Sequence, residues 1–261
     1  MSQYRAVPRD GLAWVTGASS GIGRAVALEL SRRGFVVIAT ARRIEHLEQL
    51  ARDAEQFSGR IIPRAADVTN RSAMAEFVAS LEGDHGPVNL AFFNVGTFTP
   101  DHLGTFGGDG FRTTFDVNIN GTINALEPLL PYMQKRGRGH LAINASVAGY
   151  GGLPRASAYG ATKAALINMC ESLKFYLDPQ GITIQVVNPG FVRTPLTDKN
   201  DFPMPFLIEM DEAADRICDG FSKGGFEIAF PRRLAWILKF LRILPYPTYF
   251  WLLNLVTRPK K

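Results

Sequence analysis

The chain has 261 residues, of which 46% are hydrophobic and 20% are charged, and this composition is that of an ordinary globular protein. Its length suits one α/β domain. The net charge of +5 comes without a nucleic-acid-binding motif, so we expect no nucleic-acid partner. Cys170 and Cys218 form no C-x-x-C pair, which argues against a disulfide scaffold and a metal site. Residues 1–9 hold no apolar run of the signal-peptide type, so we expect a cytoplasmic protein.

Short β-branched runs alternate along the chain with longer amphipathic segments. Strands are predicted at residues 12–16, 35–40, 61–66, 88–93, 140–146, 182–187 and 226–230, and helices at residues 20–33, 44–57, 72–81, 158–177 and 210–222. A long helical stretch over residues 109–135 is expected to break near Pro128 and Pro131, because a proline inside a helix removes a backbone hydrogen bond.

The predicted strands are continuous apolar runs, which indicates a parallel sheet covered by helices on both faces. The expected fold is a doubly wound, Rossmann-type α/β sheet of about seven strands, which binds ligands at the carboxyl ends of its strands. We expect residues 1–230 to form this single domain. Residues 231–261 are expected to form an apolar and basic C-terminal extension packed on it.

A glycine-rich turn follows the first predicted strand and leads into the first helix. It reads Thr16-Gly17-Ala18-Ser19-Ser20-Gly21-Ile22-Gly23. Glycines let the chain turn sharply and let a pyrophosphate approach, and the free N–H groups at a helix start favour phosphates. We therefore expect a dinucleotide site at this turn.

The second predicted strand ends in Thr40-Ala41-Arg42-Arg43. A dinucleotide fold selective for NAD usually places an acid there, to bind the ribose 2′-hydroxyl. Two arginines stand there instead, and a guanidinium can hold a 2′-phosphate through two parallel hydrogen bonds. The sequence therefore predicts NADP(H) as the cofactor.

Ser146 ends the fifth predicted strand, and Tyr159 and Lys163 lie four residues apart on one face of the following helix. A free tyrosine has a pKa of about 10. A lysine close to it, together with a positively charged nicotinamide, would favour the phenolate and so lower that pKa. By themselves, however, a tyrosine and a lysine four residues apart on a helix are usually ordinary surface residues.

Together these motifs resemble the short-chain dehydrogenase/reductase family. The resemblance covers residues 11–196 and also includes, in order, Asp67-Val68, Asn94-Val95-Gly96, Asn118, Pro189-Gly190 and Thr194. One departure follows the fourth strand, where the family's usual Asn-Asn-Ala-Gly reads Phe93-Asn94-Val95-Gly96.

The resemblance implies a role for each matching residue. Tyr159 would act as general acid and base, Ser146 would hydrogen-bond the reacting oxygen, and Lys163 would bind the nicotinamide ribose. Asn118 would hold a water of a proton relay. The residues implied in cofactor binding are Gly17, Ser19, Ser20, Gly21, Ile22, Gly23, Arg42, Arg43, Asp67, Val68, Asn94, Gly96, Tyr159, Lys163, Pro189, Gly190, Val192 and Thr194. The family's habit also implies a homodimer or homotetramer.

Apolar side chains are expected around the substrate. The candidate walls are Phe98, Val147, Tyr150, Leu153, Phe191 and Val192, under a lid at residues 195–208 that contains Phe202. This lining favours an apolar carbonyl compound or alcohol as substrate. The alternative is that many of these residues pack the core.

The C-terminal extension is aromatic and leucine-rich but is interrupted by Lys239, Arg242, Pro245 and Pro247, so it is a poor transmembrane span. Three hypotheses remain open for it: a subunit interface, an in-plane contact with the inner face of a membrane, and a cover over the substrate mouth.

The leading hypothesis for the whole chain is an NADP(H)-dependent oxidoreductase that interconverts an apolar carbonyl compound and its alcohol. The alternatives are a catalytically silent NADPH-binding regulator and a membrane-associated scaffold on the same fold.

Overall fold

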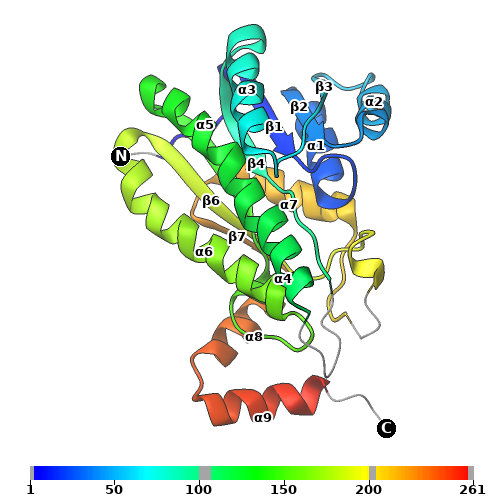
Figure 1. The fold of residues 1–261 in the computed structure, drawn as a ribbon, viewed down its shortest axis with the longest axis vertical. Helices are drawn as coiled ribbons and strands as arrows, with labels where there is room; N and C mark the ends of the chain where they lie inside the picture. Colours follow the sequence, from blue (N-terminus) through cyan, green and yellow to red (C-terminus); the bar gives the residue numbers. More distant parts are fainter. Residues whose placement is uncertain (1–2, 100–106, 200–203, 258–261) are drawn as a thin grey trace.

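The computed structural model describes residues 3–99, 107–199 and 204–257. These residues contain a seven-stranded sheet in the order β3-β2-β1-β4-β5-β6-β7, with every neighbouring pair parallel (Figure 1). The strands are β1 (Leu12–Thr16), β2 (Val36–Ala41), β3 (Arg60–Ala65), β4 (Val88–Phe93), β5 (Gly139–Asn144), β6 (Ile182–Pro189) and β7 (Glu227–Phe230). The predicted doubly wound, Rossmann-type fold is confirmed.

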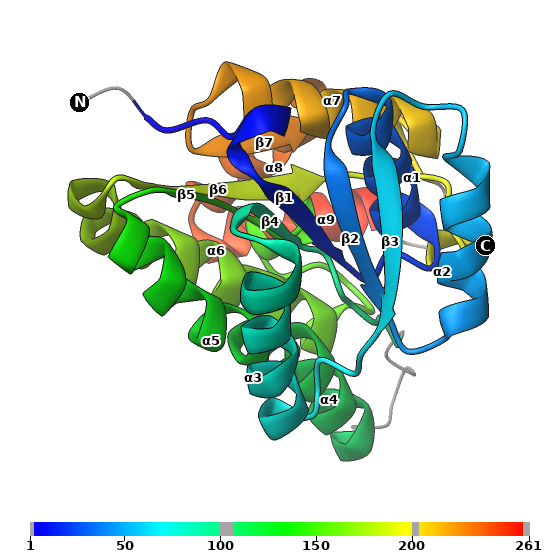
Figure 2. The same cartoon turned by 90° about the horizontal axis from the view of Figure 1, so that it is seen from above.

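Helices cover both faces of this sheet, as Figure 2 shows from above. One face carries α1 (Gly21–Arg32), α2 (Ile44–Asp53) and α7 (Met210–Lys223), and the other carries α3 (Arg71–Ser80), α5 (Gly121–Arg136) and α6 (Ser157–Leu177), with α4 (Gly108–Phe115) beside α6. Each layer buries its own apolar cluster against the strands. Burial on both faces explains why the strands read as continuous apolar runs.

The long helical stretch of the middle of the chain does not break at its prolines. A π-helical turn at Asp116–Asn120 joins α4 to α5, and α5 continues through Pro128 and Pro131. The break predicted near these prolines is therefore wrong. Leu129 and Met133 of the same helix are fully buried, and this packing offsets the backbone hydrogen bonds that the prolines remove.

Two further helices, α8 (Arg232–Arg242) and α9 (Tyr246–Thr257), follow β7. They form the lowest layer of the molecule in Figure 1, beneath α4 and α6. Leu234 and Ala235 of α8 pack with Val147. The Tyr249 phenol of α9 donates a hydrogen bond of 2.6 Å to the Gly152 carbonyl. In the ranges that the structure describes, no helix combines the length and the apolar content needed to cross a bilayer.

Trp14 of β1 is the largest side chain at the centre of the sheet, and it is fully buried. Its ring meets Phe93 edge-on with 5.5 Å between centroids, and its Nε1 donates a hydrogen bond of 2.8 Å to Thr40 Oγ1. The Trp14→Ala variant is expected to lose about 3–5 kcal/mol of unfolding free energy, because it leaves a cavity in a close-packed core. Urea denaturation followed by circular dichroism measures this loss.

The matched control is Phe175→Ala, since the Phe175 side chain is 85% exposed. This change should alter the unfolding free energy by less than about 0.5 kcal/mol. Equal losses in the two variants would contradict the central packing role of Trp14.

Candidate active site

The order of the sheet reverses between β1 and β4, since β2 follows β1 on one side and β5 follows β4 on the other. In open parallel sheets, ligands bind outside the carboxyl ends of the strands at such a point. A cleft of about 570 Å³ lies there. Residues at or just beyond the ends of β1, β2, β3, β4, β5 and β6 line it.

The glycine-rich turn forms one wall of this cleft. Gly17 and Gly21 have φ angles of +68° and +57°, in the left-handed region that favours glycine. A Cβ atom on Gly23 would lie 2.4 Å from the Gly17 carbonyl oxygen, so this position needs a glycine for packing. Ser20 begins α1 without a side-chain hydrogen bond to the helix, so the first backbone N–H groups of α1 stay available to a phosphate.

Arg42 and Arg43 stand exposed at the far end of the cleft and line it. Within the described part of the chain, neither guanidinium forms an ion pair with a carboxylate. Arg43 also caps α2 without a side-chain hydrogen bond, at the positive end of that helix. An anion such as a phosphate would relieve the repulsion that this arrangement creates.

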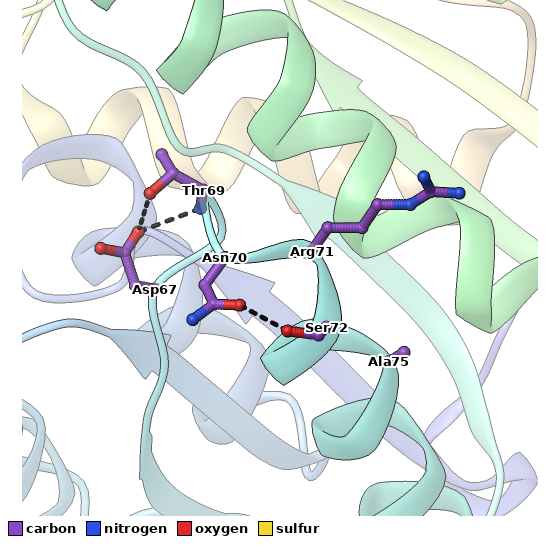
Figure 3. Close-up of a pocket in the computed structure, with 6 residues that line it drawn as sticks. All are labelled: Asp67, Thr69, Asn70, Arg71, Ser72 and Ala75. Carbon is purple, nitrogen blue, oxygen red and sulfur yellow. Dashed lines mark hydrogen bonds between the residues drawn. The ribbon is translucent and has the colours of Figure 1, made fainter.

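Asp67, just beyond β3, also lines the cleft. Its Oδ1 accepts hydrogen bonds from the backbone N–H and the hydroxyl of Thr69, at 3.0 and 2.8 Å. Figure 3 shows the carboxylate held against Thr69 in a shallow hollow at the start of α3, with Arg71 pointing away from it. The carboxylate is thus fixed before any ligand arrives.

Asn94, just beyond β4, ties three strand ends together. Its Nδ2 donates to the carbonyl oxygens of Thr16 and Gly17, at 3.3 and 3.4 Å, and its backbone N–H donates to Thr16 Oγ1 at 3.0 Å. Its Oδ1 accepts a hydrogen bond of 2.8 Å from Asn144 Nδ2, at the end of β5. The glycine turn and the end of β5 are therefore held in fixed relation.

Lys163 is almost completely buried on α6. Its Nζ donates a hydrogen bond of 2.6 Å to the Asn144 carbonyl oxygen and lies 5.5 Å from the centre of the Tyr159 ring. A Cβ atom on Gly96 would come within 3.6 Å of this Nζ, so the small residue keeps the space beside the ammonium open. The ammonium has three donors, which leaves capacity for hydroxyl groups of a ligand.

Asn118 lies in the π-helical turn and is fully buried behind the cleft. Its Oδ1 accepts from the Thr97 backbone N–H at 2.7 Å, and its Nδ2 donates to the Thr97 carbonyl and to Thr162 Oγ1, at 3.2 and 3.0 Å. Both polar atoms of the side chain are thus engaged by the protein. A π-bulge inside a helix often marks a functional site.

Ser146 and Tyr159 face each other at the closed end of the cleft. The Ser146 hydroxyl accepts from the Ala148 backbone N–H at 3.1 Å and donates to the Pro189 carbonyl at 3.3 Å. The Tyr159 ring packs edge-on against Phe98, with 5.3 Å between the ring centroids. Ser146, Tyr159 and Lys163 therefore converge as the sequence predicts.

Burial governs the protonation of Tyr159 and Lys163 in the free protein. Burial raises the pKa of its phenol, and hydrogen bonding with Ser146 opposes this only in part. Burial also lowers the pKa of the Lys163 ammonium to about 7, so this group carries only part of a charge at neutral pH. In the free protein the loss of hydration therefore dominates at Tyr159. The lowering of this pKa by Lys163 together with a positively charged nicotinamide concerns the cofactor-bound protein and stays a prediction.

All residues predicted to bind the cofactor line the cleft except Gly23, which packs beneath it. Sequence reasoning missed Thr97, Thr113, Val117 and Asn144, which also line it. Three of these had a signal in the sequence: Thr113 and Val117 stand four residues apart, and Asn144 is a polar residue at the end of an apolar strand.

The predicted substrate walls are only partly found at the cleft. Val192 lines it, and so do Pro195, Leu196 and Thr197 at the start of the predicted lid. Phe202 lies outside the described residues. Val147, Tyr150 and Phe191 do not line the cleft, and they pack with α8 instead. The Tyr150 phenol donates a hydrogen bond of 2.6 Å to Glu227, so its polar end also turns away. For these three residues the core-packing alternative holds.

Known proteins are similar to this chain in sequence and in fold. A profile of the short chain dehydrogenase family matches residues 12–203. The chain is 37% identical over 237 residues to an uncharacterized oxidoreductase of Myxococcus xanthus, which covers 91% of this chain and 94% of that protein. It is 32% identical over 185 residues to the 3-oxoacyl-(acyl-carrier-protein) reductase FabG of Thermotoga maritima, which covers 71% of this chain and 75% of that protein.

The fold matches a short-chain dehydrogenase from Sphingobium yanoikuyae in complex with NADPH. The TM-score is 0.79 at 24% identity, over 96% of this chain and 98% of that chain. A doubly wound fold with this turn and this Ser-Tyr-Lys site defines a class of nucleotide-dependent oxidoreductases. The chain belongs to the short-chain dehydrogenase/reductase family.

Lys163 gives the free protein a distinct pH dependence. Its pKa is about 7 in the folded protein, against 10.5 for an ordinary lysine. Between these values the unfolded chain binds more protons at this residue than the folded protein does. The unfolding free energy contributed by Lys163 therefore rises with pH across this window.

The Lys163→Met variant lacks this titration, so its stability relative to the parent should be greatest below pH 7 and should fall toward pH 10.5. Across this pH window, the difference in unfolding free energy between the variant and the parent changes by at most about 5 kcal/mol. Urea denaturation of the cofactor-free proteins at about pH 6 and about pH 10 measures it. Lys174→Met is the control, since Lys174 pairs with Asp178 at the surface. Parallel pH profiles for Lys163→Met and the parent would refute the prediction.

Proposed function

We propose that the protein is an NADP(H)-dependent oxidoreductase that interconverts an apolar carbonyl compound and its alcohol. One observation carries this proposal. Ser146, Tyr159 and Lys163 converge at one end of a cleft whose other end bears Arg42 and Arg43.

The residues of the cleft fit NADP(H) from end to end. The start of α1 offers uncapped N–H groups for the pyrophosphate, and Lys163 keeps donors for the nicotinamide ribose. Arg42 and Arg43 stand where a 2′-phosphate would be held. The cofactor of the family is NAD(H) or NADP(H), and these arginines support NADP(H).

The chain's own groups supply the acid–base chemistry. The bound cofactor would supply the hydride. Tyr159 keeps its proton in the free protein because burial raises its pKa, so its phenol is suited to protonate a carbonyl oxygen during reduction. Ser146 would hydrogen-bond the same oxygen and stabilise the charge that develops on it. In the reverse direction, the Lys163 ammonium beside Tyr159 would stabilise the phenolate.

The charge of the cleft supports an apolar substrate. Its charged lining residues are Arg42, Arg43, Asp67 and Lys163. The first three belong to the adenosine end, and Lys163 is buried beneath the site. Among the described lining residues, none is a separate anchor for a charged substrate. The name of the Thermotoga relative describes a 3-oxoacyl reductase, so 3-oxoacyl thioesters belong in a substrate panel.

Replacing Tyr159 separates catalysis from binding. NADPH oxidation is measured against apolar aldehydes, ketones and 3-oxoacyl thioesters. Tyr159→Phe is expected to lower kcat about 10²–10⁴-fold, because it removes the proton donor, and to leave the Kd for NADPH within about threefold. Tyr176→Phe, on the exposed side of α6, is the control.

Two results would point to the alternatives. Turnover that persists in Tyr159→Phe would contradict the assigned acid. An absence of turnover on the whole panel, with NADPH bound tightly, would favour the catalytically silent regulator.

The arginine pair is tested by cofactor affinity. Arg42→Ala combined with Arg43→Ala is expected to weaken NADPH binding about ten- to a hundredfold, because charge-assisted hydrogen bonds to the 2′-phosphate are lost. NADH binding should change little. Arg52→Ala is the control, since Arg52 lies exposed on α2, the helix that follows the two arginines. An equal loss of affinity for NADPH and NADH would refute the assignment to NADP(H).

The homodimer or homotetramer implied by the family resemblance stays a prediction.

A further inference from the structure

The C-terminal helices expose an apolar surface that the proposed reaction does not use. On α8 and at Ile243, the residue that caps its C-terminal end, the side chains of Trp236, Phe240 and Ile243 are 68%, 60% and 76% exposed, and they recur at intervals of four and three residues. Such spacing places them on one face of the helix. On α9, Phe250, Trp251 and Leu255 are each more than half exposed. We call these six side chains the C-terminal apolar face.

The face belongs to helices that are firmly packed on their other side. Leu234 and Ala235 of α8 and Tyr249 of α9 are buried. Lys239 pairs with Glu227 of β7, and this carboxylate also accepts the hydrogen bond of Tyr150. The outward aromatic side chains are therefore not a consequence of loose helices, because each helix has an inward face with specific partners.

Positive charge surrounds the C-terminal apolar face. Residues 228–261 contain seven lysines and arginines and no aspartate or glutamate, whereas residues 1–227 contain slightly more acidic than basic residues. Within the described helices, Arg232 and Arg233 are exposed one turn before Trp236 on α8. Arg242 is exposed as well, and its guanidinium lies 6.0 Å from the centre of the Tyr246 ring. An anionic partner complements this arrangement.

We propose that the C-terminal apolar face docks, in plane, on a bilayer surface rich in anionic lipids. Short helices with aromatic and leucine side chains on one side and flanking basic residues bind at the boundary between headgroups and acyl chains. Tryptophan is favoured at that depth, and anionic lipids attract the arginines. A second copy of the chain fits less well, since a two-fold contact would bring the same cations face to face.

The docking surface lies beside the catalytic segment. Leu234 and Ala235 pack against Val147, the residue that follows Ser146. A Cβ atom on Gly190, which lines the cleft, would lie 2.9 Å from Leu234. Docking through α8 and α9 would therefore hold this side of the site close to the lipid.

Vesicle flotation of the full chain tests the proposal without any substrate. The probes are vesicles of phosphatidylcholine alone and vesicles in which a quarter of the lipid is phosphatidylglycerol. The protein is expected to bind the anionic vesicles about tenfold more tightly, with an affinity that falls as salt rises. Trp236→Ser combined with Trp251→Ser should weaken this binding about tenfold or more, while NADPH affinity and the circular dichroism spectrum stay unchanged.

Two further variants complete the design. Arg232→Gln combined with Arg233→Gln should reduce the preference for anionic vesicles. Phe175→Ser, which removes a still more exposed aromatic side chain from α6, should leave binding unchanged. Tryptophan fluorescence gives an independent readout in the parent, because Trp14 is fully buried and the other two of the chain's three tryptophans lie on the face. Anionic vesicles should shift its emission to the blue.

Three outcomes would overturn the proposal. One is an absence of binding to anionic vesicles. Another is equal binding by the parent and the double tryptophan variant. The third is a parent dimer, seen by light scattering, that the tryptophan changes dissociate and that binds no vesicles, which would make the face an interface between two copies.

Discussion

The hydrogen bonds of Asn94 are the constraint on which the rest of the site depends. They join the glycine turn after β1 to the end of β5, through Gly17 on one side and Asn144 on the other. The carbonyl of Asn144 in turn holds the buried Lys163 ammonium. One amide side chain thus connects the nucleotide half of the cleft to the catalytic half. The two halves come from segments more than a hundred residues apart in the sequence, and the parallel sheet alone would align their strands but not their loops.

Burial sets the protonation of the catalytic groups before a cofactor binds. The same loss of hydration raises the pKa of Tyr159 and lowers the pKa of Lys163, so both groups are driven toward their neutral forms. The free protein therefore resembles the state needed to donate a proton more than the state needed to accept one. Oxidation of an alcohol requires Tyr159 as a phenolate to accept the proton. The oxidation direction therefore depends on the positive charge that a bound oxidised cofactor would add.

The sequence predicts the fold because its signals are local. Continuous apolar strands, amphipathic helices and a glycine-rich turn each depend on a few neighbouring residues, whereas the order of the strands in the sheet comes from the structure. The prolines of α5 mislead because the buried Leu129 and Met133 hold the helix through contacts that only the tertiary structure supplies. The site residues that belong to a motif were found from the sequence, whereas Thr97 reaches the cleft through folding alone. Tyr150 was misplaced because its partner, Glu227, is 77 residues away.

The hydrogen bonds of Asn118 affect how a loss of activity in an Asn118 variant would be interpreted. Its amide joins the loop after β4 to α6 by bonding Thr97 on both its backbone groups and Thr162 on its hydroxyl. The backbone carbonyl oxygen of Asn118 accepts a further hydrogen bond of 2.8 Å from the Thr122 hydroxyl. An Asn118 variant would therefore let the floor of the cleft separate from the helix that carries Tyr159 and Lys163. A fall in rate after such a change would report a displaced scaffold as readily as a broken path for protons.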